Sequence, residues 1–243
     1  MKDNFSGHAA DYAKYRPQYS KELISYLVNL APAHHLAWDC ATGNGQVAGV
    51  LSEYFAEVVA TDISEKQIQS AVQKPNITYK VEAAEQSSLA DASVDLVVVA
   101  QAVHWFEFDK FYAEVKRVLR PEGVLALVGY GLIKVNAEVD KVIYKLYEGI
   151  LGKYWDPERN YIDEAYQTIP FPFQEVQIPQ FSIKYTWAIE DIINYLNTWS
   201  AVKHYEKATG QNPVQLIEQE LQEAWPQQQT EVKFNIIARV GKV

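Results

Sequence analysis

The sequence is poor in sulfur and has no long apolar run. Its 243 residues include one cysteine, Cys40, and one methionine. A lone cysteine can form neither an internal disulfide nor a cysteine-rich metal cluster, which fits the reducing cytoplasm. The longest aliphatic runs, such as residues 96–100, are far shorter than the roughly 20 residues that cross a bilayer, and the N-terminus lacks the apolar stretch of a secretory signal. We therefore expect a cytoplasmic protein with no membrane partner.

Positive charge is also scarce. The chain has 22 lysines and arginines against 31 acids, a net charge of −9 at pH 7. An anionic surface repels phosphate backbones, so we expect no nucleic-acid partner. The histidines show no metal-like spacing with each other or with acids, so we also expect no catalytic metal. No repeat, charge block or glycine-serine linker divides the chain, and its length suits one large domain.

Short apolar runs alternate with amphipathic stretches over the first half of the chain. This alternation predicts right-handed crossovers and a doubly wound α/β sheet, whose ligands lie outside the carboxyl ends of the strands. The expected strands are residues 35–40, 58–61, 77–81, 94–100, 123–128, 181–187 and 231–240, and the expected helices are residues 21–30, 46–55, 64–72, 108–119, 138–151, 190–197 and 213–224.

A glycine-containing loop follows the first expected strand, as Asp39-Cys40-Ala41-Thr42-Gly43-Asn44-Gly45. Such a loop lets a nucleotide approach the backbone at a helix N-terminus, and residues 43–48 also match the dinucleotide fingerprint. Asp39 favours a different ligand, because a carboxylate at the strand end would repel a pyrophosphate. S-adenosylmethionine brings a sulfonium and an ammonium instead. Asp62, at the end of the second strand, can accept hydrogen bonds from both ribose hydroxyls, or it can simply stabilise the start of the next helix.

The chain resembles the class I S-adenosylmethionine-dependent methyltransferases, and among them the small-molecule enzymes that include trans-aconitate methyltransferases. The resemblance covers nearly the whole chain. In the family the first loop glycine stands where this chain has Ala41. Besides the loop, the resemblance rests on residues 12–17, 61–64, 83–85, 93–97, 101–106, 114–125, 196–202 and 239–242.

The resemblance implies a cofactor role for residues at the ends of four strands. The backbone of Ala41 and Gly43 would lie against the methionine part of the cofactor, with Asp39 near its amino group and Gly45 closing the loop. Asp62 would hold the ribose, and Gln101 would reach the methionine part. Ile63 would pack on the adenine and Ala84 would meet the adenine edge with Glu85 nearby, although core packing explains Ile63 and Ala84 nearly as well.

We expect a Rossmann-like, seven-stranded and mostly parallel sheet with an antiparallel last strand. The chain is predicted to form a single domain over residues 1–243. A lid formed by residues 1–19 and a helical, irregular insertion at residues 132–173 are expected to cover the carboxyl-end face.

On the acceptor side, His104, Arg16 and Tyr15 are the candidate catalytic residues. His104 follows the fourth strand and could act as a general base or only orient its loop. Arg16 could clamp a carboxylate, with Arg159 as a second candidate, and an ionised carboxylate acceptor would need no base. A dry aromatic pocket favours displacement at a sulfonium. The candidate wall residues, each also explicable as core, are Tyr12, Trp105, Tyr130, Trp155 and Tyr161.

Two other functions remain open from the sequence. Tyr112 and Lys116 have the Tyr-x-x-x-Lys spacing of short-chain NAD-dependent oxidoreductases, although the apolar face of the surrounding helix favours a chance match. A protein that binds S-adenosylmethionine without catalysis would also keep the loop, Asp62 and Gln101. The preferred prediction is a methyltransferase that acts on a small molecule, possibly a carboxylate.

Overall fold

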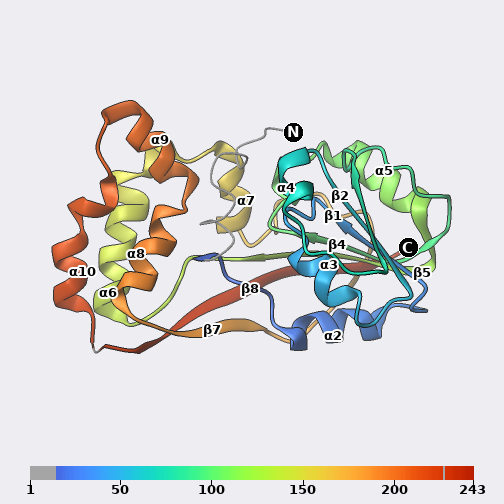
Figure 1. Ribbon diagram of the computed structural model, residues 1–243, viewed down its shortest axis with the longest axis horizontal. Helices are drawn as coiled ribbons and strands as arrows, with labels where there is room; N and C mark the ends of the chain where they lie inside the picture. The colour runs from blue at the N-terminus through green and yellow to red at the C-terminus, as the bar shows by residue number, and fades with distance from the viewer. Residues whose placement is uncertain (1–14, 227) are drawn as a thin grey trace.

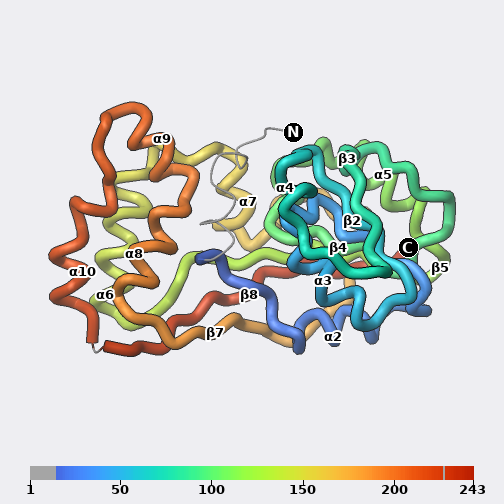
Figure 2. The backbone as a smooth tube through the Cα atoms, in the orientation of Figure 1, coloured from blue at the N-terminus to red at the C-terminus, as the bar shows by residue number. Residues whose placement is uncertain are grey.

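The computed structural model describes residues 15–226 and 228–243. Figure 1 shows two parts: a sheet flanked by helices, and a group of helices beyond one end of it. Two long strands, β7 and β8, run from the sheet to the helical group, and the tube in Figure 2 follows the chain along them. The chain thus crosses repeatedly between the two parts, and the region where they meet can draw on both.

The sheet has the predicted doubly wound order β3-β2-β1-β4-β5-β8-β6, with β7 also paired to β8. The first five strands are parallel, and β8 runs antiparallel to β5, β6 and β7. The strands of the described residues are β1 (Leu36–Cys40), β2 (Glu57–Asp62), β3 (Ile77–Val81), β4 (Val94–Ala100), β5 (Leu119–Tyr130), β6 (Gln174–Val176), β7 (Ser182–Trp187) and β8 (Thr230–Lys242).

The prediction of a mostly parallel α/β sheet with an antiparallel last strand is confirmed. The structure divides the edge position into two short strands. Val176 of β6 pairs with Val240, whereas Ser182 of β7 pairs with Asn235 at the other end of β8. The described residues therefore form eight strands at seven positions, because Pro179 and its neighbours interrupt one edge strand.

Both faces of the sheet are covered, as the near-continuous apolar run in β4 predicts. Successive side chains of a strand point to opposite faces. Leu96 accordingly packs in the same core as residues of α2 (Lys21–Leu30) and α3 (Gln46–Leu51), and Val97 packs with residues of α5 (Phe108–Val118). A short helix, α4 (Glu65–Gln69), follows β2.

The sequence explains where these helices begin. The Ser20 hydroxyl caps α2 by accepting a hydrogen bond from the Leu23 amide, and Ser64 caps α4 through the Gln67 amide. A serine just before an amphipathic stretch is a common signal for the start of a helix. Four apolar side chains of α2 face the core, so burial holds the helix against the sheet.

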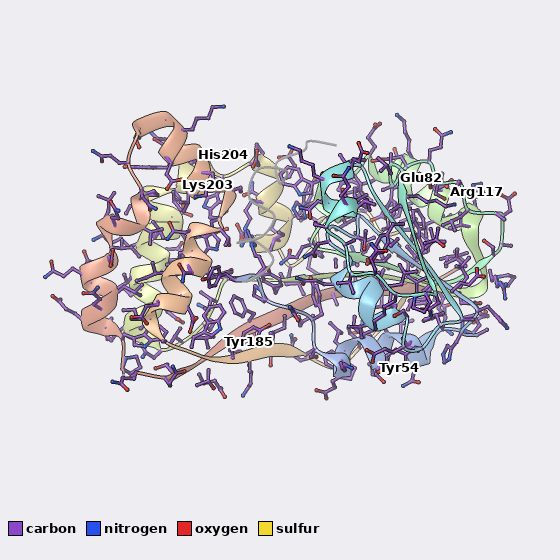
Figure 3. The ribbon with its side chains drawn as sticks, in the orientation of Figure 1. Tyr54, Glu82, Arg117, Tyr185, Lys203 and His204 are labelled. Atoms are coloured by element: carbon purple, nitrogen blue, oxygen red, sulfur yellow. The ribbon has the colours of Figure 1, made fainter. Side chains whose placement is uncertain are left out.

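The helical group is larger than the insertion predicted at residues 132–173. That insertion contributes α6 (Ala137–Tyr144), a π-helical turn at Lys145–Ile150, two 3-10 turns and α7 (Asn160–Asp163). The segment between β7 and β8 adds α8 (Ile189–Asn197), α9 (Ser200–Thr209), a 3-10 turn and α10 (Glu218–Ala224). His204 of α9, labelled in Figure 3, bonds the Tyr154 carbonyl at 2.8 Å and so joins the two segments.

The described end of the predicted lid, residues 15–19, lies between the two parts of the molecule. The Gln18 amide donates to the hydroxyl of Tyr185 on β7 at 2.8 Å (Figure 3). Arg16 donates to the Tyr130 hydroxyl at 3.4 Å and to the Thr198 carbonyl at 3.1 Å. These contacts fix the segment over the end of β5. The rest of the predicted lid, including Tyr12, lies outside the described residues. No helix in the described part is long and apolar enough to span a membrane.

Candidate active site

The glycine loop after β1 is tightly wound. Ala41, Gly43 and Gly45 all have left-handed backbones, with φ of 57°, 56° and 77°. At Gly45 a Cβ atom would lie 2.2 Å from the hydroxyl oxygen of Tyr79, so only glycine fits this position without displacing that ring. The loop leads directly into α3, so it lies at a helix N-terminus.

Two buried carboxylates hold this loop. Asp39 accepts hydrogen bonds through Oδ2 from the Thr42 hydroxyl and from the Ala48 amide at 2.8 Å. Asp62 accepts from the Gly43 amide and from the Ser64 amide, each at 2.9 Å. The sequence placed these acids at neighbouring strand ends, and the structure brings both against one loop.

Asp39 has capacity for another donor. Its Oδ1 is buried and has no hydrogen-bond partner among the residues that the structure describes. Burial raises the pKa of this carboxyl to about 6, against the opposing effect of the Thr42 and Ala48 hydrogen bonds. A carboxylate that is costly to ionise gains when a cationic ligand group arrives. The raised pKa and the unused oxygen of Asp39 fit the ammonium group of S-adenosylmethionine, which the resemblance implies near this residue.

Gln101 lies at the end of β4, next to the loop. Its backbone is also left-handed, with φ of 55°. Its amide donates to the Val128 carbonyl at 2.8 Å, and its side-chain Nε2 donates to the Tyr130 carbonyl at 3.2 Å. Its Oε1 is buried without a partner among residues 15–226 and 228–243. The side chain is thus held in place with one acceptor available to a ligand.

The other predicted cofactor residues follow β2 and β3. Ile63 directly follows β2, and Ala84 is buried in the turn after β3. Glu85 accepts a hydrogen bond from the Glu107 amide at 3.0 Å, which links this turn to the start of α5. These observations place all of the predicted cofactor residues at the carboxyl end of the sheet, and their individual roles stay predictions.

A narrow pocket opens beside Gln101, where the helical group meets the sheet. It encloses about 60 Å³, much less than the roughly 300–1,000 Å³ of a typical small-molecule site, so it suits a small polar group. Six predicted residues line it, namely Arg16, Gln101, His104, Trp105, Trp155 and Arg159. The other lining residues are Asp156, Ile162, Trp199 and Ser200.

Three predicted residues, Tyr15, Tyr130 and Tyr161, are not among those that line this pocket. Tyr130 is buried, packs edge-on against Phe234 and accepts the hydrogen bond from Arg16. Tyr161 packs edge-on against Phe108. Their contacts are those of core aromatics, the other interpretation that the sequence left open.

His104 is a poor general base in this environment. Burial and, secondarily, the charge of Arg159 lower the pKa of its imidazole to about 3. The ring is neutral at physiological pH, but a group with so low a pKa takes up a proton from an alcohol or amine only weakly. Its Nδ1 is buried without a partner in the described part of the chain, which suits a hydrogen bond to a ligand.

Arg159 is the pocket residue whose positive charge is best positioned to bind an anion. Its guanidinium lies 5.2 Å from the centre of the Trp155 ring and 5.4 Å from that of Tyr147. Its Nε donates to the Tyr147 hydroxyl at 3.0 Å, and that hydroxyl in turn bonds the Asp163 carboxylate. Its two terminal nitrogens make no hydrogen bond within residues 15–226 and 228–243. They therefore present the fork that binds a carboxylate through two parallel bonds.

Sequence reasoning missed several pocket residues. Asp156 precedes Pro157 and has the sequence of a helix cap, and Trp199 occurs in a stretch that resembles the family, but neither signal indicates a pocket. Trp155 and Trp199 meet with ring centres 5.4 Å apart, although they belong to segments separated by two strands. Only the tertiary structure brings them together.

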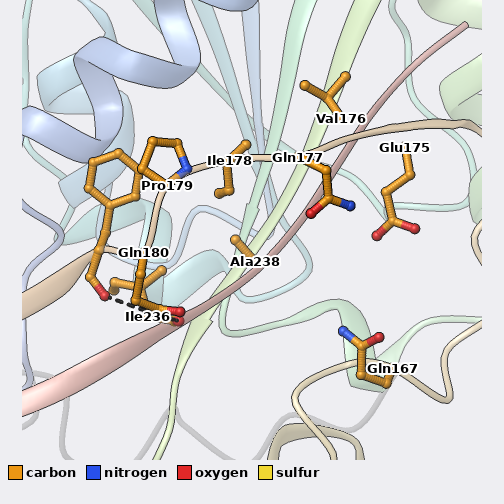
Figure 4. A pocket seen from close by; sticks show the side chains of 10 residues that line it. Gln167, Glu175, Val176, Gln177, Ile178, Pro179, Gln180, Ile236 and Ala238 are labelled. Carbon is orange, nitrogen blue, oxygen red and sulfur yellow. Dashed lines mark hydrogen bonds between the residues drawn. The ribbon is translucent and has the colours of Figure 1, made fainter.

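A second hollow of about 280 Å³ lies at the sheet edge, where β6 and β7 are interrupted. Figure 4 shows glutamines 167, 177 and 180 around it, with Ile236 and Ala238 of β8 behind. Its one charged residue, Glu175, is paired with Arg239 at 2.9 Å. Among its lining residues it offers no nucleophile and no available cation, unlike the pocket beside Gln101. No cluster of metal-binding side chains occurs among the described residues.

Comparison with known proteins distinguishes a methyltransferase from an oxidoreductase. Tyr112 of the Tyr-x-x-x-Lys match is buried against Phe111 and Phe173, as a core residue would be. The family model of a methyltransferase domain matches residues 38–127. A protein of Dictyostelium discoideum named as a methyltransferase is 36% identical over 92% of this chain and 86% of its own length.

A solved structure and a further relative agree. A structure from Anaeromyxobacter dehalogenans, described as a type II methyltransferase, has 42% identity and a TM-score of 0.88, and the match covers 94% of this chain and 98% of that one. An uncharacterized methyltransferase of Mycobacterium tuberculosis is 34% identical over 73% of this chain and 68% of its own length. The chain belongs to the class I S-adenosylmethionine-dependent methyltransferases, an enzyme family.

Proposed function

We propose that this enzyme transfers a methyl group from S-adenosylmethionine to a carboxylate oxygen of a small organic acid. The observation that carries the proposal is the free fork of Arg159 in a pocket whose histidine has a pKa of about 3. A carboxylate is already ionised at neutral pH, so methylation at its oxygen needs no base, whereas methylation of an alcohol does. The pocket supplies the clamp that an acid needs, and its histidine is too weak a base to favour acceptors that must lose a proton.

The residues around the loop fit the cofactor. When bound, S-adenosylmethionine supplies an electrophilic methyl group, and transfer forms an O–CH₃ bond as the S–CH₃ bond breaks. Asp39 and Gln101 would accept hydrogen bonds from the methionine part through their two buried oxygens that lack partners among the described residues. Asp62, whose carboxylate already bonds the Gly43 and Ser64 amides of the loop, would accept from the ribose. Ala41, Gly43 and Gly45 would allow close approach, and Ile63, Ala84 and Glu85 would surround the adenine.

The protein's own contribution is positioning and the exclusion of water. Trp105, Trp155 and Trp199 line the pocket, and their rings tolerate a nearby cation while keeping water out. Arg159 would hold the acceptor carboxylate, and Arg16 would fix the N-terminal segment over it through Tyr130 and Thr198. Much of the rate can come from such alignment alone. A small-molecule partner, no nucleic-acid partner and a cytoplasmic location belong to the same proposal, which the net charge of −9 and the single thiol support.

The test uses a donor with a labelled methyl group and a panel of small carboxylic acids. We expect a labelled product that mild alkali cleaves to methanol, because esters hydrolyse there and methyl ethers and methylamines do not. Arg159→Gln should lower kcat/KM by about 100-fold and Arg159→Lys by about 10-fold, since a lysine keeps the charge but loses the fork. Lys153→Gln removes an exposed charge from the same segment and should change little. An alkali-stable product would contradict the proposal.

A further inference from the structure

Asp156 occupies a capping position that its side chain does not use. It directly precedes Pro157, which opens the 3-10 turn Pro157–Arg159, and its carbonyl accepts the hydrogen bond from the Arg159 amide at 2.9 Å. An aspartate at this position normally caps the turn with its carboxylate. Here the side chain makes no capping hydrogen bond. Local structure therefore gives this carboxylate no role.

The same carboxylate lines the pocket and remains unsatisfied. Its Oδ2 is buried and has no hydrogen-bond partner in the described part of the chain. Within the described residues the guanidinium of Arg159 forms its ion pair with Asp163, at 3.6 Å, and none with Asp156. A buried acceptor without a donor is costly, and such groups persist where a ligand supplies the missing partner.

Asp156 and Arg159 are three residues apart, so the two ligand groups that they would bind must be neighbours in the ligand. Asp156 precedes the 3-10 turn Pro157–Arg159 and Arg159 ends it, so only one short turn separates the two residues. Both line one pocket of about 60 Å³. A ligand group held by Asp156 must therefore lie next to the carboxylate held by Arg159.

We propose that Asp156 reads a hydroxyl group on the carbon next to the acceptor carboxylate, so that the enzyme selects 2-hydroxy acids. This inference rests on the proposed function and adds the substrate class. A hydroxyl suits the site better than an ammonium, because Arg16 and Arg159 already bring two positive charges to the pocket and the cofactor brings a sulfonium. Asp156 determines which substrate is bound and does not take part in the transfer itself, because it would accept a hydrogen bond from a group that is not methylated.

The test gives the full chain sets of three acids that share one carbon skeleton. In each set one acid carries a 2-hydroxyl group, one carries a 2-amino group and one has no substituent at that carbon. The methyl donor is labelled, and the methyl ester is the product that is measured. We expect kcat/KM for the hydroxy acid to exceed that for the unsubstituted acid by about 10- to 100-fold. Asp156→Asn and Asp156→Ala should each reduce this ratio by about 10-fold or more, mainly through KM. Glu148→Gln, an exposed acid of the same insertion, should preserve the ratio.

The outcomes separate the two proposals. Equal kcat/KM for hydroxy and unsubstituted acids, a preference for the amino acid, or a ratio unchanged in both Asp156 variants overturns this inference and leaves carboxylate methylation standing. No methyl ester from any acid overturns the proposed function and this inference with it. Melting temperature and adenosylhomocysteine affinity check that the variants fold, and Asp156→Asn, the closer in shape, provides the result if the alanine variant fails.

Discussion

Acidification should weaken cofactor binding through Asp39. Burial raises the pKa of this carboxyl to about 6 in the ligand-free protein, and its Oδ1 has no partner among the described residues. If only the ionised carboxyl holds the amino group of adenosylhomocysteine, the apparent Kd is constant above about pH 7 and rises as pH falls through about 6, because binding must then displace a proton. From about pH 7.5 to about pH 5 the expected increase in Kd is about tenfold.

Titration calorimetry across this range, in buffers with different ionisation enthalpies, measures both the affinity and the protons released. Near pH 6, where half of the free protein is protonated, binding should release about 0.5 proton. Asp39→Asn should bind more weakly at neutral pH and lose the pH dependence, whereas Asp109→Asn, an exposed acid on α5, should behave as the wild type. A constant Kd from neutral to acid pH, or a pH dependence that survives Asp39→Asn, would refute the role of Asp39.

Three further substitutions test other parts of the site. Gly45→Ala places a Cβ against the Tyr79 hydroxyl at positive φ and should lower stability by about 2 kcal/mol, measured by urea unfolding; an unchanged midpoint would contradict the packing argument. Ala41→Gly relieves a left-handed alanine and should raise the melting temperature by about 1 °C after the entropy cost of glycine, so a lower melting temperature would count against strain there. Tyr147→Phe removes the hydroxyl that holds Arg159 and should lower acceptor kcat/KM about tenfold with adenosylhomocysteine affinity unchanged; equal losses of both would indicate general disruption.

The sheet was predictable because its signals are local. Each expected parallel strand is a short apolar run followed by a helix with a recognisable start, such as Ser20 before α2 and Ser64 before α4. The cofactor residues share this advantage, because parallel strands end at one edge of the sheet and an acid at a strand end must lie there. The interruption between β6 and β7 was not predicted, since both short segments become strands only by pairing with β8.

The acceptor pocket was predictable only in part because it is assembled from distant segments. His104 and Trp105 follow β4, and the sequence identifies them by that position. Trp199 and Ser200 come from the junction of α8 and α9, which the insertion predicted at residues 132–173 did not include. Nothing in the local pattern distinguishes their side chains from core or surface residues. The same holds for Asp156, whose sequence context indicates a helix cap rather than a pocket acid.

Backbone strain marks the place where the two sites meet. Ala41 after β1 and Gln101 after β4 both have left-handed φ, 57° and 55°, although neither is glycine. The two strands are neighbours, with Cys40 paired to Val99, so the strained residues lie side by side at the ligand edge. Each such residue costs about 1 kcal/mol. At Gln101 this conformation accompanies a side chain that is bonded to the Tyr130 carbonyl, lines the acceptor pocket and keeps Oε1 available. Strained residues of this kind cluster at ligand-binding sites, so the conformation of Gln101 supports the proposal that donor and acceptor meet at this junction.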